Sequence, residues 1–423
     1  MRKIKNGLIL AGGDSSRLWP FEEKNLLYFL DKPLILYQIR ELAKYVENVT
    51  VVVNKRNAIA VKRMIENEDR IGKIEVIIQK DIDGQAGAVL SVKDLIKGDL
   101  LVINANDVLD MSSINRITKF PLPNNKIVFF GKKLNEYFPG GYFKLNTKNQ
   151  IDEIIEKPGK EMRPSNMVKL MMDYFSDADI LFRSIQKAKT KYDNLYETAL
   201  NELLSSPINS ELIPYDGYWE TIKYPWHILS MMRLFLSMIK NSRIDESAVV
   251  SKNAIIDGPV IIGKNARIGD FVKITGPVFI GENSIIGDFS LVRDSHIGQD
   301  SLIGSYSEIA RSYIGNRVFL HRNYVGDSVL GDKVTMGAQA VTANLRFDGE
   351  PIASYVGDEK IDTNMSKLGV MIGNESKIGV NVTIVPGAKI GKKSWISPRE
   401  VVKYDVDDNT FLDGGEENIN LKV

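Results

Sequence analysis

The sequence contains no cysteine and very little histidine, and both scarcities limit the chemistry that the chain can perform. Without cysteine there is no disulfide, no thiolate metal site and no cysteine nucleophile. Only three side chains have an unperturbed pKa suited to proton transfer near neutral pH, namely His227, His296 and His321. Any general acid or base of the histidine type must be one of these three.

Long apolar runs and an excess of charge of either sign are also missing. No apolar stretch approaches the roughly 20 residues that cross a membrane, and the first residues lack the apolar core of a signal peptide. Lys and Arg (55) almost cancel Asp and Glu (54), which argues against nucleic acid as the main partner. We therefore expect a cytoplasmic protein, with neither a membrane nor a nucleic acid as partner. Its 423 residues suffice for two or three domains.

Aliphatic residues recur at a spacing of six through most of the second half of the chain. Neither a helix nor an ordinary strand has this period, whereas a hexapeptide β-helix places one inward-pointing aliphatic side chain on each short strand. Three such strands make one coil of about 18 residues. The period slips near Ile297 and Ile314 and returns from Ile372 to Val402, so we predict a parallel β-helix over residues 243–403. Its first run is Ile244, Val250, Ile256, Ile262, Ile268, Ile274, Ile280, Ile286 and Val292.

Three other segments surround or interrupt this repeat. The period breaks over residues 341–370, which predicts a loop leaving one coil, either a passive insertion or a binding loop. Residues 227–242 are rich in Leu, Ile, Met and Phe at helical spacing and predict a linker helix, with His227 on the surface at its start. Residues 404–423 are acidic and polar, and predict a flexible or loosely docked C-terminal tail.

Residues 1–226 alternate between strand-like and helix-like patterns. Strands are predicted at 5–11, 49–53, 74–79 and 100–104, and helices at 33–45, 58–68 and 86–96. This alternation indicates a doubly wound, Rossmann-like α/β domain with its ligand crevice at the carboxyl ends of the strands.

The first predicted strand runs into L-A-G-G-D-S-S-R-L-W-P at residues 10–20. Small residues let backbone N–H groups approach phosphate oxygens, and Arg17 adds a fixed cation. A glycine pair after a strand also fits any tight turn. The whole stretch, however, resembles the L-A-G-G-x-G-T-R-L-x-P signature of sugar-1-phosphate nucleotidylyltransferases.

That resemblance implies a nucleoside triphosphate, UTP or dTTP, and a sugar 1-phosphate as substrates, with Mg²⁺ as cofactor. In-line attack on the α-phosphorus depends on positioning and on charge neutralisation. Two of the residues that carry this resemblance also have a purely structural interpretation, because Asp107 fits a carboxylate in a turn and Lys157 fits a solvated lysine on the surface. By resemblance the catalytic residues are Arg17 and Lys24, the nucleotide-binding residues Gly12, Gly13, Gln79 and Gly84, the metal ligand Asp107, and the sugar-binding residues Gly140, Glu156 and Lys157.

The chain departs from the same family at several positions. Ser15 replaces a glycine, Lys169 falls in the segment where the family has N-x-G-x-Y, and Thr221 replaces the second metal carboxylate. Only Glu220 could substitute for that carboxylate, but adjacent side chains on a strand point to opposite faces. These departures leave open a first domain that has been respecified or is inactive.

His321 introduces a second group of motifs. Residues 319–327 read F-L-H-R-N-Y-V-G-D and residues 341–349 read V-T-A-N-L-R-F-D-G. Their H-x-x-Y-x-G-D and T-x-N patterns resemble the acetyltransferase domain of the bifunctional N-acetylglucosamine-1-phosphate uridyltransferase/glucosamine-1-phosphate acetyltransferase family. A base with a pKa of about 6.5 can take the proton from a protonated amino sugar so that the amine attacks acetyl-CoA.

By this resemblance His321 is the base, Tyr324 and Asn344 orient the sugar amine, and Lys367 binds sugar or phosphate. The resemblance also implies a left-handed β-helix and a homotrimer with acetyl-CoA between neighbouring subunits. Arg293 and Arg311 lie 18 residues apart, one coil, and predict either a phosphate clamp or solvated edge arginines. For His296 we expect a turn or stacking role.

The sequence thus predicts a bifunctional enzyme that makes UDP-N-acetylglucosamine or a related nucleotide sugar. The first alternative is an acetyltransferase with a degenerate or respecified nucleotide-binding domain. The second is a non-catalytic assembly subunit, against which the intact set of His321, Tyr324 and Asn344 argues.

Overall fold

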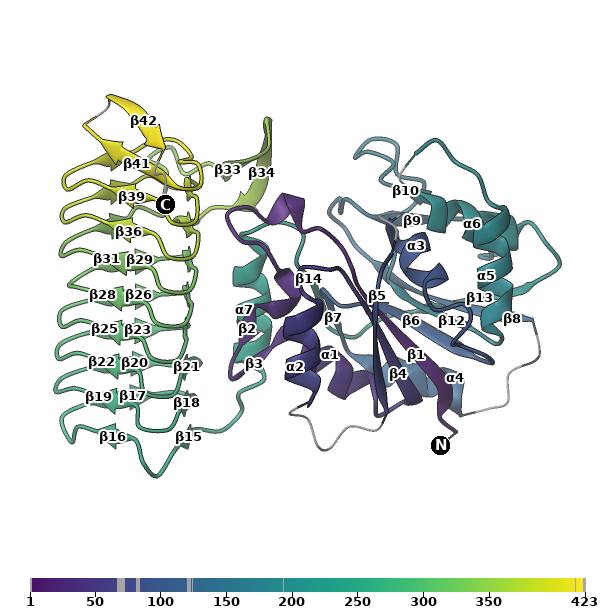
Figure 1. Ribbon diagram of the computed structural model, residues 1–423, viewed down its shortest axis with the longest axis horizontal. Helices are drawn as coiled ribbons and strands as arrows, with labels where there is room; N and C mark the ends of the chain where they lie inside the picture. The colour runs from purple at the N-terminus through teal and green to yellow at the C-terminus, as the bar shows by residue number, and fades with distance from the viewer. Residues whose placement is uncertain are drawn as a thin grey trace. The chain divides into compact units, whose positions relative to one another are not determined.

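The computed structural model describes residues 2–66, 73–80, 84–119, 123, 125–192, 194–414 and, by backbone only, 416–420. The chain forms two compact units (Figure 1). One contains Met1–Asp14 and Leu34–Trp219, and the other contains Ser15–Pro33 and Glu220–Val423. No helix among the described residues is long and apolar enough to span a membrane.

The first unit is built on a mixed sheet with strand order β10-β9-β11-β8-β12-β6-β1-β4-β5, to which β13 adds by pairing with β8. In this sheet β1, β4, β5 and β6 are parallel to one another. The strands are β1 (Ile4–Ala11), β4 (Val46–Val53), β5 (Ile74–Ile78), β6 (Leu100–Asn104), β8 (Lys126–Lys133), β9 (Gly141–Leu145), β10 (Ile151–Glu156), β11 (Met167–Lys169), β12 (Met172–Phe175) and β13 (Asn209–Pro214), with the short β7 (Asp107–Leu109) off the main sheet. The short strand β14 (Trp219–Thr221) starts at the last residue of this unit.

Three helices alternate with the parallel strands of this unit, namely α1 (Leu34–Leu42), α2 (Ala58–Glu66) and α3 (Gly84–Leu90). The other helices are α4 (Asn115–Thr118), α5 (Ala178–Lys187) and α6 (Leu195–Leu204). Strand β1 is buried at all but one position, as expected of a parallel strand covered on both faces. The α/β prediction is confirmed, and the carboxyl ends of β1 and β6 lie directly before Gly12 and shortly before Asp107.

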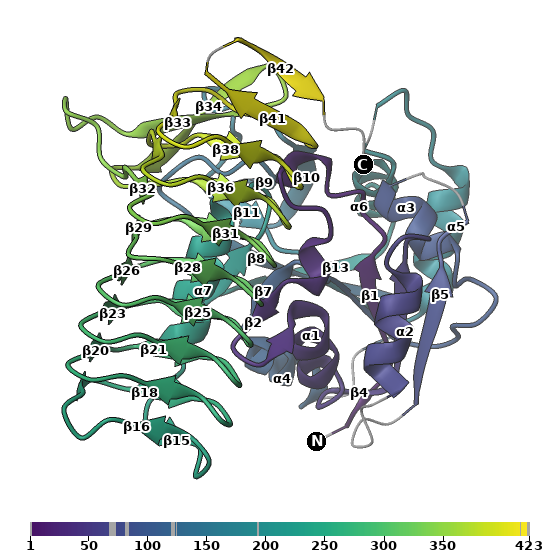
Figure 2. The same cartoon turned by 60° about the vertical axis from the view of Figure 1, so that its left-hand side comes forward.

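The second unit is a β-helix whose coils stack in one direction (Figure 2). Each of its three faces is a sheet of parallel strands, except that β42 pairs antiparallel with β41 at the end of one face, and we name each face by its first strand. The β15 face contains β15 (Arg243–Ile244), β18 (Val260–Ile262), β21 (Val278–Ile280), β24 (His296–Ile297), β27 (Tyr313–Ile314), β30 (Val329–Leu330), β35 (Met371–Ile372) and β38 (Lys389–Ile390).

The other two faces are the β16 face and the β17 face. The β16 face contains β16 (Val249–Val250), β19 (Arg267–Ile268), β22 (Ile285–Ile286), β25 (Leu302–Ile303), β28 (Phe319–Leu320), β31 (Thr335–Met336), β36 (Lys377–Ile378), β39 (Trp395–Ile396), β41 (Thr410–Asp413) and β42 (Glu416–Asn420). The β17 face contains β17 (Ile255–Asp257), β20 (Lys273–Thr275), β23 (Leu291–Arg293), β26 (Glu308–Ala310), β29 (Tyr324–Gly326), β32 (Val341–Thr342), β37 (Thr383–Ile384) and β40 (Val401–Val402).

The aliphatic residue of each strand lies inside the coil and stacks on its equivalent in the next coil. Ile262 pairs with Ile280 at an offset of 18, but Ile280 pairs with Ile297 at 17 and Ile314 with Leu330 at 16. All five side chains are buried. The β-helix prediction is confirmed, and the slips in the sequence period are coils that are one or two residues shorter.

The predicted loop at 341–370 contains an antiparallel hairpin, β33 (Ile352–Val356) and β34 (Glu359–Met365). Leu330 and Ile372, on either side of it, are in direct register, so the stack of coils continues as if the insertion were absent. The hairpin projects from one edge of the solenoid (Figure 1).

Three expectations are corrected. The segment from Tyr404 is not a loose tail as far as Asp413, because β41 pairs with β39 and extends the β16 face. Residues 1–226 do not form one unit, because Ser15–Pro33, including the hairpin of β2 (Tyr28–Phe29) and β3 (Lys32–Pro33), belongs to the solenoid unit.

His227, predicted on the surface, starts the linker helix α7 (His227–Ser237) and is partly buried. Its Nδ1 accepts a hydrogen bond from the Lys223 backbone N–H at 3.2 Å, and its ring packs edge-on against Tyr224. Burial lowers the pKa of His227 to about 4. A local sequence pattern does not reveal this packing.

Candidate active sites

In the first unit, three predicted nucleotide-binding residues meet beyond the end of β1. A Cβ atom added to Gly12 would lie 2.3 Å from Oε1 of Gln79. The Gln79 side-chain amide donates to the Gly84 carbonyl at 3.1 Å. Any side chain at position 12 would therefore displace the Gln79 amide, which makes glycine the residue that fits this approach. The Gly13 carbonyl accepts from the Asn54 side chain at 3.2 Å.

Asp107 begins β7, three residues after β6 ends. The residue is buried, its Oδ1 accepts from the Asn106 side chain at 3.2 Å, and its carbonyl accepts from the Gln38 side chain at 2.6 Å. Among the described residues there is no group of three or more His, Cys, Asp or Glu side chains that could hold a metal ion. Since Mg²⁺ is commonly held by one carboxylate together with substrate phosphates, Asp107 suits a metal that arrives with the nucleotide.

The predicted sugar-binding residues also lie together. The Gly140 carbonyl accepts from the Lys157 backbone N–H at 3.1 Å, and Oε2 of Glu156 lies 3.2 Å from where a Cβ of Gly141 would be. Glu156 lines a cavity of about 610 Å³ beside α6. Lys157 has a positive φ of 46° and an ammonium 3.4 Å from the Glu156 carboxylate.

Lys169, which departs from the family pattern, is buried in an ion pair beneath this site. Its Nζ lies 2.7 Å from Oδ2 of Asp173, and Oδ2 also accepts from the Tyr196 hydroxyl at 2.9 Å. Burial raises the pKa of Asp173, while the Lys169 ammonium opposes that rise. Burial also raises the pKa of Glu197 to about 7, with the Glu156 charge adding to the effect.

Sequence reasoning marked Lys169 as a departure but missed Asp173, Tyr196 and Glu197. The spacing of four between Lys169 and Asp173 suggests a pair, but only the turn between β11 and β12 brings the two charges together.

The remaining signature residues, Arg17 and Lys24, belong to the solenoid unit. Arg17 lies in a short 3₁₀ turn, Ser16–Leu18, and Lys24 opens another, Lys24–Leu26. Ser15, which replaces the family's glycine, has φ 59° and ψ 21°. That left-handed conformation suits glycine, so the substitution keeps the shape of the loop at the cost of backbone strain.

The acetyltransferase motifs form one connected network on the β17 face. Arg311 donates Nε to Oδ1 of Asp327 at 2.7 Å and Nη2 to Oδ2 at 2.6 Å. The Asn344 amide donates to Oδ2 of Asp327 at 2.5 Å and to the Tyr324 hydroxyl at 3.2 Å. A Cβ at Gly326 would lie within 2.7 Å of both the Tyr324 hydroxyl and the Asn344 amide. The G-D and T-x-N motifs are thus parts of a single arrangement.

His321 lies on the turn that leads into β29, three residues before Tyr324. Its side chain is exposed, and among the described residues no protein group hydrogen-bonds its imidazole. Its backbone N–H donates to Oδ1 of Asn323 at 2.5 Å, while the Asn323 amide donates to the Gly337 and Ala340 carbonyls at 2.9 and 2.8 Å. Asn323, which the motif analysis passed over, therefore fixes the turn that carries the histidine.

Lys367 and the two arginines complete the predicted set. Lys367 is exposed, and its backbone forms an isolated antiparallel β-bridge with Leu345 where the insertion returns to the solenoid. The Arg311 backbone N–H donates to the Arg293 carbonyl at 2.9 Å, so the two residues lie in neighbouring coils. Arg293 forms an ion pair with Glu308, and Arg311 with Asp327, so both guanidinium groups are partly neutralised by carboxylates.

Two protein-family models match the chain. The nucleotidyl transferase model covers residues 6–222, and a second model, described as the GMPPB C-terminal domain, covers residues 238–346. The chain belongs to the nucleotidyl transferase family. The prediction drawn from the L-A-G-G motif is thereby confirmed at the level of the family.

Relatives of this nucleotidyl transferase match it over nearly their whole length. It is 31% identical to the bifunctional protein GlmU of Methanococcus aeolicus, covering 98% of each chain. It is 34% identical to the bifunctional sugar-1-phosphate nucleotidylyltransferase/acetyltransferase of Sulfurisphaera tokodaii, covering 96% of this chain and 98% of the relative. Among solved structures, a UDP-glucose pyrophosphorylase complexed with UDP-glucose matches with a TM-score of 0.47 and 19% identity, over 55% of this chain and 99% of that one.

Proposed function

We propose that this protein is a bifunctional transferase. It acetylates an amino-sugar 1-phosphate with acetyl-CoA and couples the acetylated sugar to a nucleoside triphosphate, giving UDP-N-acetylglucosamine or a related nucleotide sugar and pyrophosphate. The observation that carries the proposal is the network of Arg311, Asp327, Asn344 and Tyr324 beside the exposed His321. Both activities are named for the relative from Sulfurisphaera tokodaii, which supports the pairing.

In the acetyl transfer, His321 takes a proton from the sugar ammonium and the free amine attacks the thioester carbonyl. The N–C bond forms as the C–S bond breaks, and CoA leaves as a thiolate that accepts a proton. Tyr324 and Asn344 hold the sugar amine, and Lys367 faces its phosphate. Asp327 acts on the substrate only through Asn344, whose amide it orients.

In the nucleotidyl transfer, a phosphate oxygen of the sugar attacks the α-phosphorus and the bond to the β-phosphate oxygen breaks. Mg²⁺, held by Asp107 and the phosphates, would neutralise the developing charge. Arg17 and Lys24 stabilise the leaving pyrophosphate, Gln79 and Gly84 read the base, and Gly140, Glu156 and Lys157 bind the sugar.

A homotrimer belongs to the same proposal. Three aromatic rings at successive turns of the solenoid support it, because Phe271, Phe289 and Tyr306 stack at centroid distances of 5.0 and 5.1 Å and are at least half exposed. An exposed apolar ladder of this kind is suited to contact with another subunit.

Two parallel assays test the function. Purified protein is incubated with Mg²⁺, N-acetylglucosamine 1-phosphate and each nucleoside triphosphate while pyrophosphate release is followed. Thiol release from acetyl-CoA is followed with glucosamine 1-phosphate. We expect both products, and we expect His321→Ala to lose thiol release but keep pyrophosphate release.

A second candidate is an acetyltransferase whose first unit has been respecified or has lost its activity. Thr221 in place of a metal carboxylate and the buried Lys169–Asp173 pair favour it. Free CoA without pyrophosphate from any triphosphate would select this candidate over the first.

A further inference from the structure

Lys389 is a buried lysine that contacts three segments distant from one another in the chain. It begins β38, and its side chain is only 2% exposed. Its ammonium pairs with Asp405, donates to the Tyr355 carbonyl at 2.6 Å and lies 3.3 Å from the Ser354 hydroxyl. It also lies 5.3 Å from the centroid of the Trp19 ring, within range of a cation–π interaction. The three donors of an ammonium are thus all used inside the protein.

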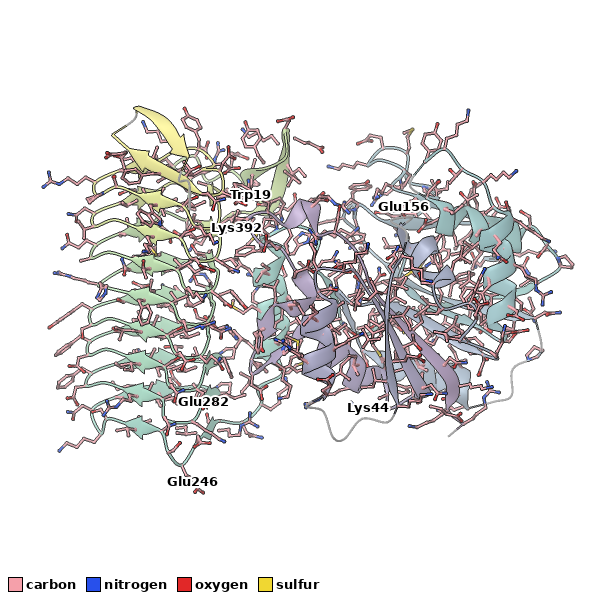
Figure 3. The ribbon with its side chains drawn as sticks, in the orientation of Figure 1. Trp19, Lys44, Glu156, Glu246, Glu282 and Lys392 are labelled. Atoms are coloured by element: carbon pink, nitrogen blue, oxygen red, sulfur yellow. The ribbon has the colours of Figure 1, made fainter. Side chains whose placement is uncertain are left out.

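Trp19 belongs to the nucleotide-binding signature, two residues after Arg17. Its Nε1–H donates to Oδ1 of Asp408 at 2.9 Å, and the same carboxylate oxygen accepts from the Lys392 backbone N–H at 3.0 Å. Glu22 forms an ion pair with the Lys392 side chain. Figure 3 labels Trp19 and Lys392, which lie near each other beside the upper coils of the solenoid. These contacts fix the first half of the segment Ser15–Pro33.

The second half of that segment is fixed on the β15 face at another point. The Tyr313 hydroxyl donates to the Tyr28 carbonyl at 2.9 Å, and Nε2 of His296 lies 3.2 Å from the Leu30 carbonyl. The His296 ring is stacked between Phe279 and Tyr313 at 4.9 and 4.8 Å. The predicted stacking role of His296 is confirmed, and the segment contacts the solenoid at Trp19, Glu22, Tyr28 and Leu30.

The other partners of Lys389 lie in the insertion of the acetyltransferase site. Ser354 and Tyr355 are on β33, in the hairpin between Asn344 and Lys367. The Ser354 hydroxyl also donates to the Gly387 carbonyl at 2.9 Å, on the coil that carries Lys389. One ammonium therefore joins β33 of the hairpin to the signature loop.

We propose that Lys389 is a positioning residue for both reactions. It holds Trp19, and through it the loop that carries Arg17, and it holds β33, and through it the insertion that carries Asn344 and Lys367. This inference rests on the function proposed above. A lysine that served folding alone would change the amount of active protein without changing the affinity of that protein for either substrate.

The test is Lys389→Met, which keeps the apolar stem and removes the three donors. We expect the KM for the nucleoside triphosphate and the KM for the amino-sugar phosphate each to rise roughly tenfold, the factor that matches loss of one charged hydrogen bond. Lys377→Met is the matched control, since this ammonium lies 4.7 Å from the Trp395 ring and its contacts involve neither loop. Both KM values should stay unchanged in it.

Hydrogen exchange gives a readout that does not need activity. In Lys389→Met, amides in residues 16–22 and 352–365 should exchange faster, while the strands of the lower coils keep their wild-type protection. If the wild-type protein lacks one of the two reactions, the proposed function is wrong for that reaction. The hydrogen-exchange result still tests whether Lys389 positions the two segments. Unchanged exchange and unchanged KM values in folded Lys389→Met would overturn the inference.

Two milder variants guard against a failure to fold. Trp19→Phe keeps an aromatic ring but loses the hydrogen bond to Asp408, and should raise only the KM for the nucleotide. Ser354→Ala loses a hydroxyl of β33 and should raise only the KM for the amino sugar. The reverse pattern, or no change in either variant, would refute the division of roles.

Discussion

Asp327 offers the sharpest test of the acetyltransferase site, because its carboxylate accepts three hydrogen bonds. Two come from Arg311 and one from Asn344, and the side chain is 5% exposed. In Asp327→Asn, one oxygen becomes an NH₂ group that faces donors. Arg311 then loses its charge partner, and Asn344 must turn away from the Tyr324 hydroxyl.

The size of the effect follows from these contacts. A hydrogen bond to a charged group contributes about 1.5–3 kcal/mol, and Arg311 retains 24% exposure, so water recovers part of the loss. We expect kcat/KM for acetyl transfer to fall by roughly 30- to 100-fold, which corresponds to about 2–3 kcal/mol. Pyrophosphate release should not change, because none of these residues belongs to the proposed nucleotide site.

Thiol release from acetyl-CoA at several concentrations of amino-sugar phosphate measures this effect. The matched control is Glu308→Gln, which removes the carboxylate paired with Arg293 where both side chains are 35% exposed. Such a half-exposed pair contributes about 1 kcal/mol or less, so activity should stay within roughly fivefold of wild type. Wild-type acetyl transfer by a folded Asp327→Asn protein would show that the network does not orient the amine.

Three further changes test other parts of the molecule. Ser15→Gly should raise the thermal midpoint in differential scanning calorimetry, because it removes about 1 kcal/mol of left-handed strain; an unchanged or lower midpoint would contradict this. Glu197 has its folded-state pKa raised to about 7, so the native state binds more protons than the unfolded state between about pH 4.5 and 7. Stability to urea should therefore fall as pH rises through that window, and Glu197→Gln should reduce the slope. Phe289→Ser interrupts the exposed aromatic ladder and should lower the sedimentation coefficient if the proposed trimer uses that surface, whereas an unchanged oligomer would exclude the ladder from the interface.

The solenoid could be predicted from sequence because most of its strands contribute one buried aliphatic residue. Ile262, Ile280 and Ile297 repeat at nearly the coil length, so the fold produces a regular spacing of apolar residues along the sequence. Part of the acetyltransferase network could be predicted for a similar reason, since Tyr324 and Asn344 occur in short motifs with fixed spacing. The pairing of Arg311 with Asp327 could not be predicted, because the shortened coils change which residues stack on one another.

The place of the signature loop could not be predicted. Trp19 bonds to a residue 389 positions away and Tyr28 to one 285 positions away, and neither contact leaves a periodic trace in the sequence. The partner of Lys169 was missed because a turn, rather than a helix, brings Asp173 to it. Such contacts depend on tertiary packing, which a pattern of apolar residues does not encode.

The segment Ser15–Pro33 has a consequence for how the solenoid comes apart. In a stack of coils each coil contacts only its neighbours, so such stacks fray from their ends. Here one piece of chain is bonded to His296 and Tyr313 on two lower coils and to Asp408 several coils above. The coils between these attachment points cannot open without stretching or releasing the segment Ser15–Pro33, so we expect them to unfold as one cooperative block. The coils of β15 and β18 lie below its lowest hydrogen-bonded attachment, and fraying should begin there.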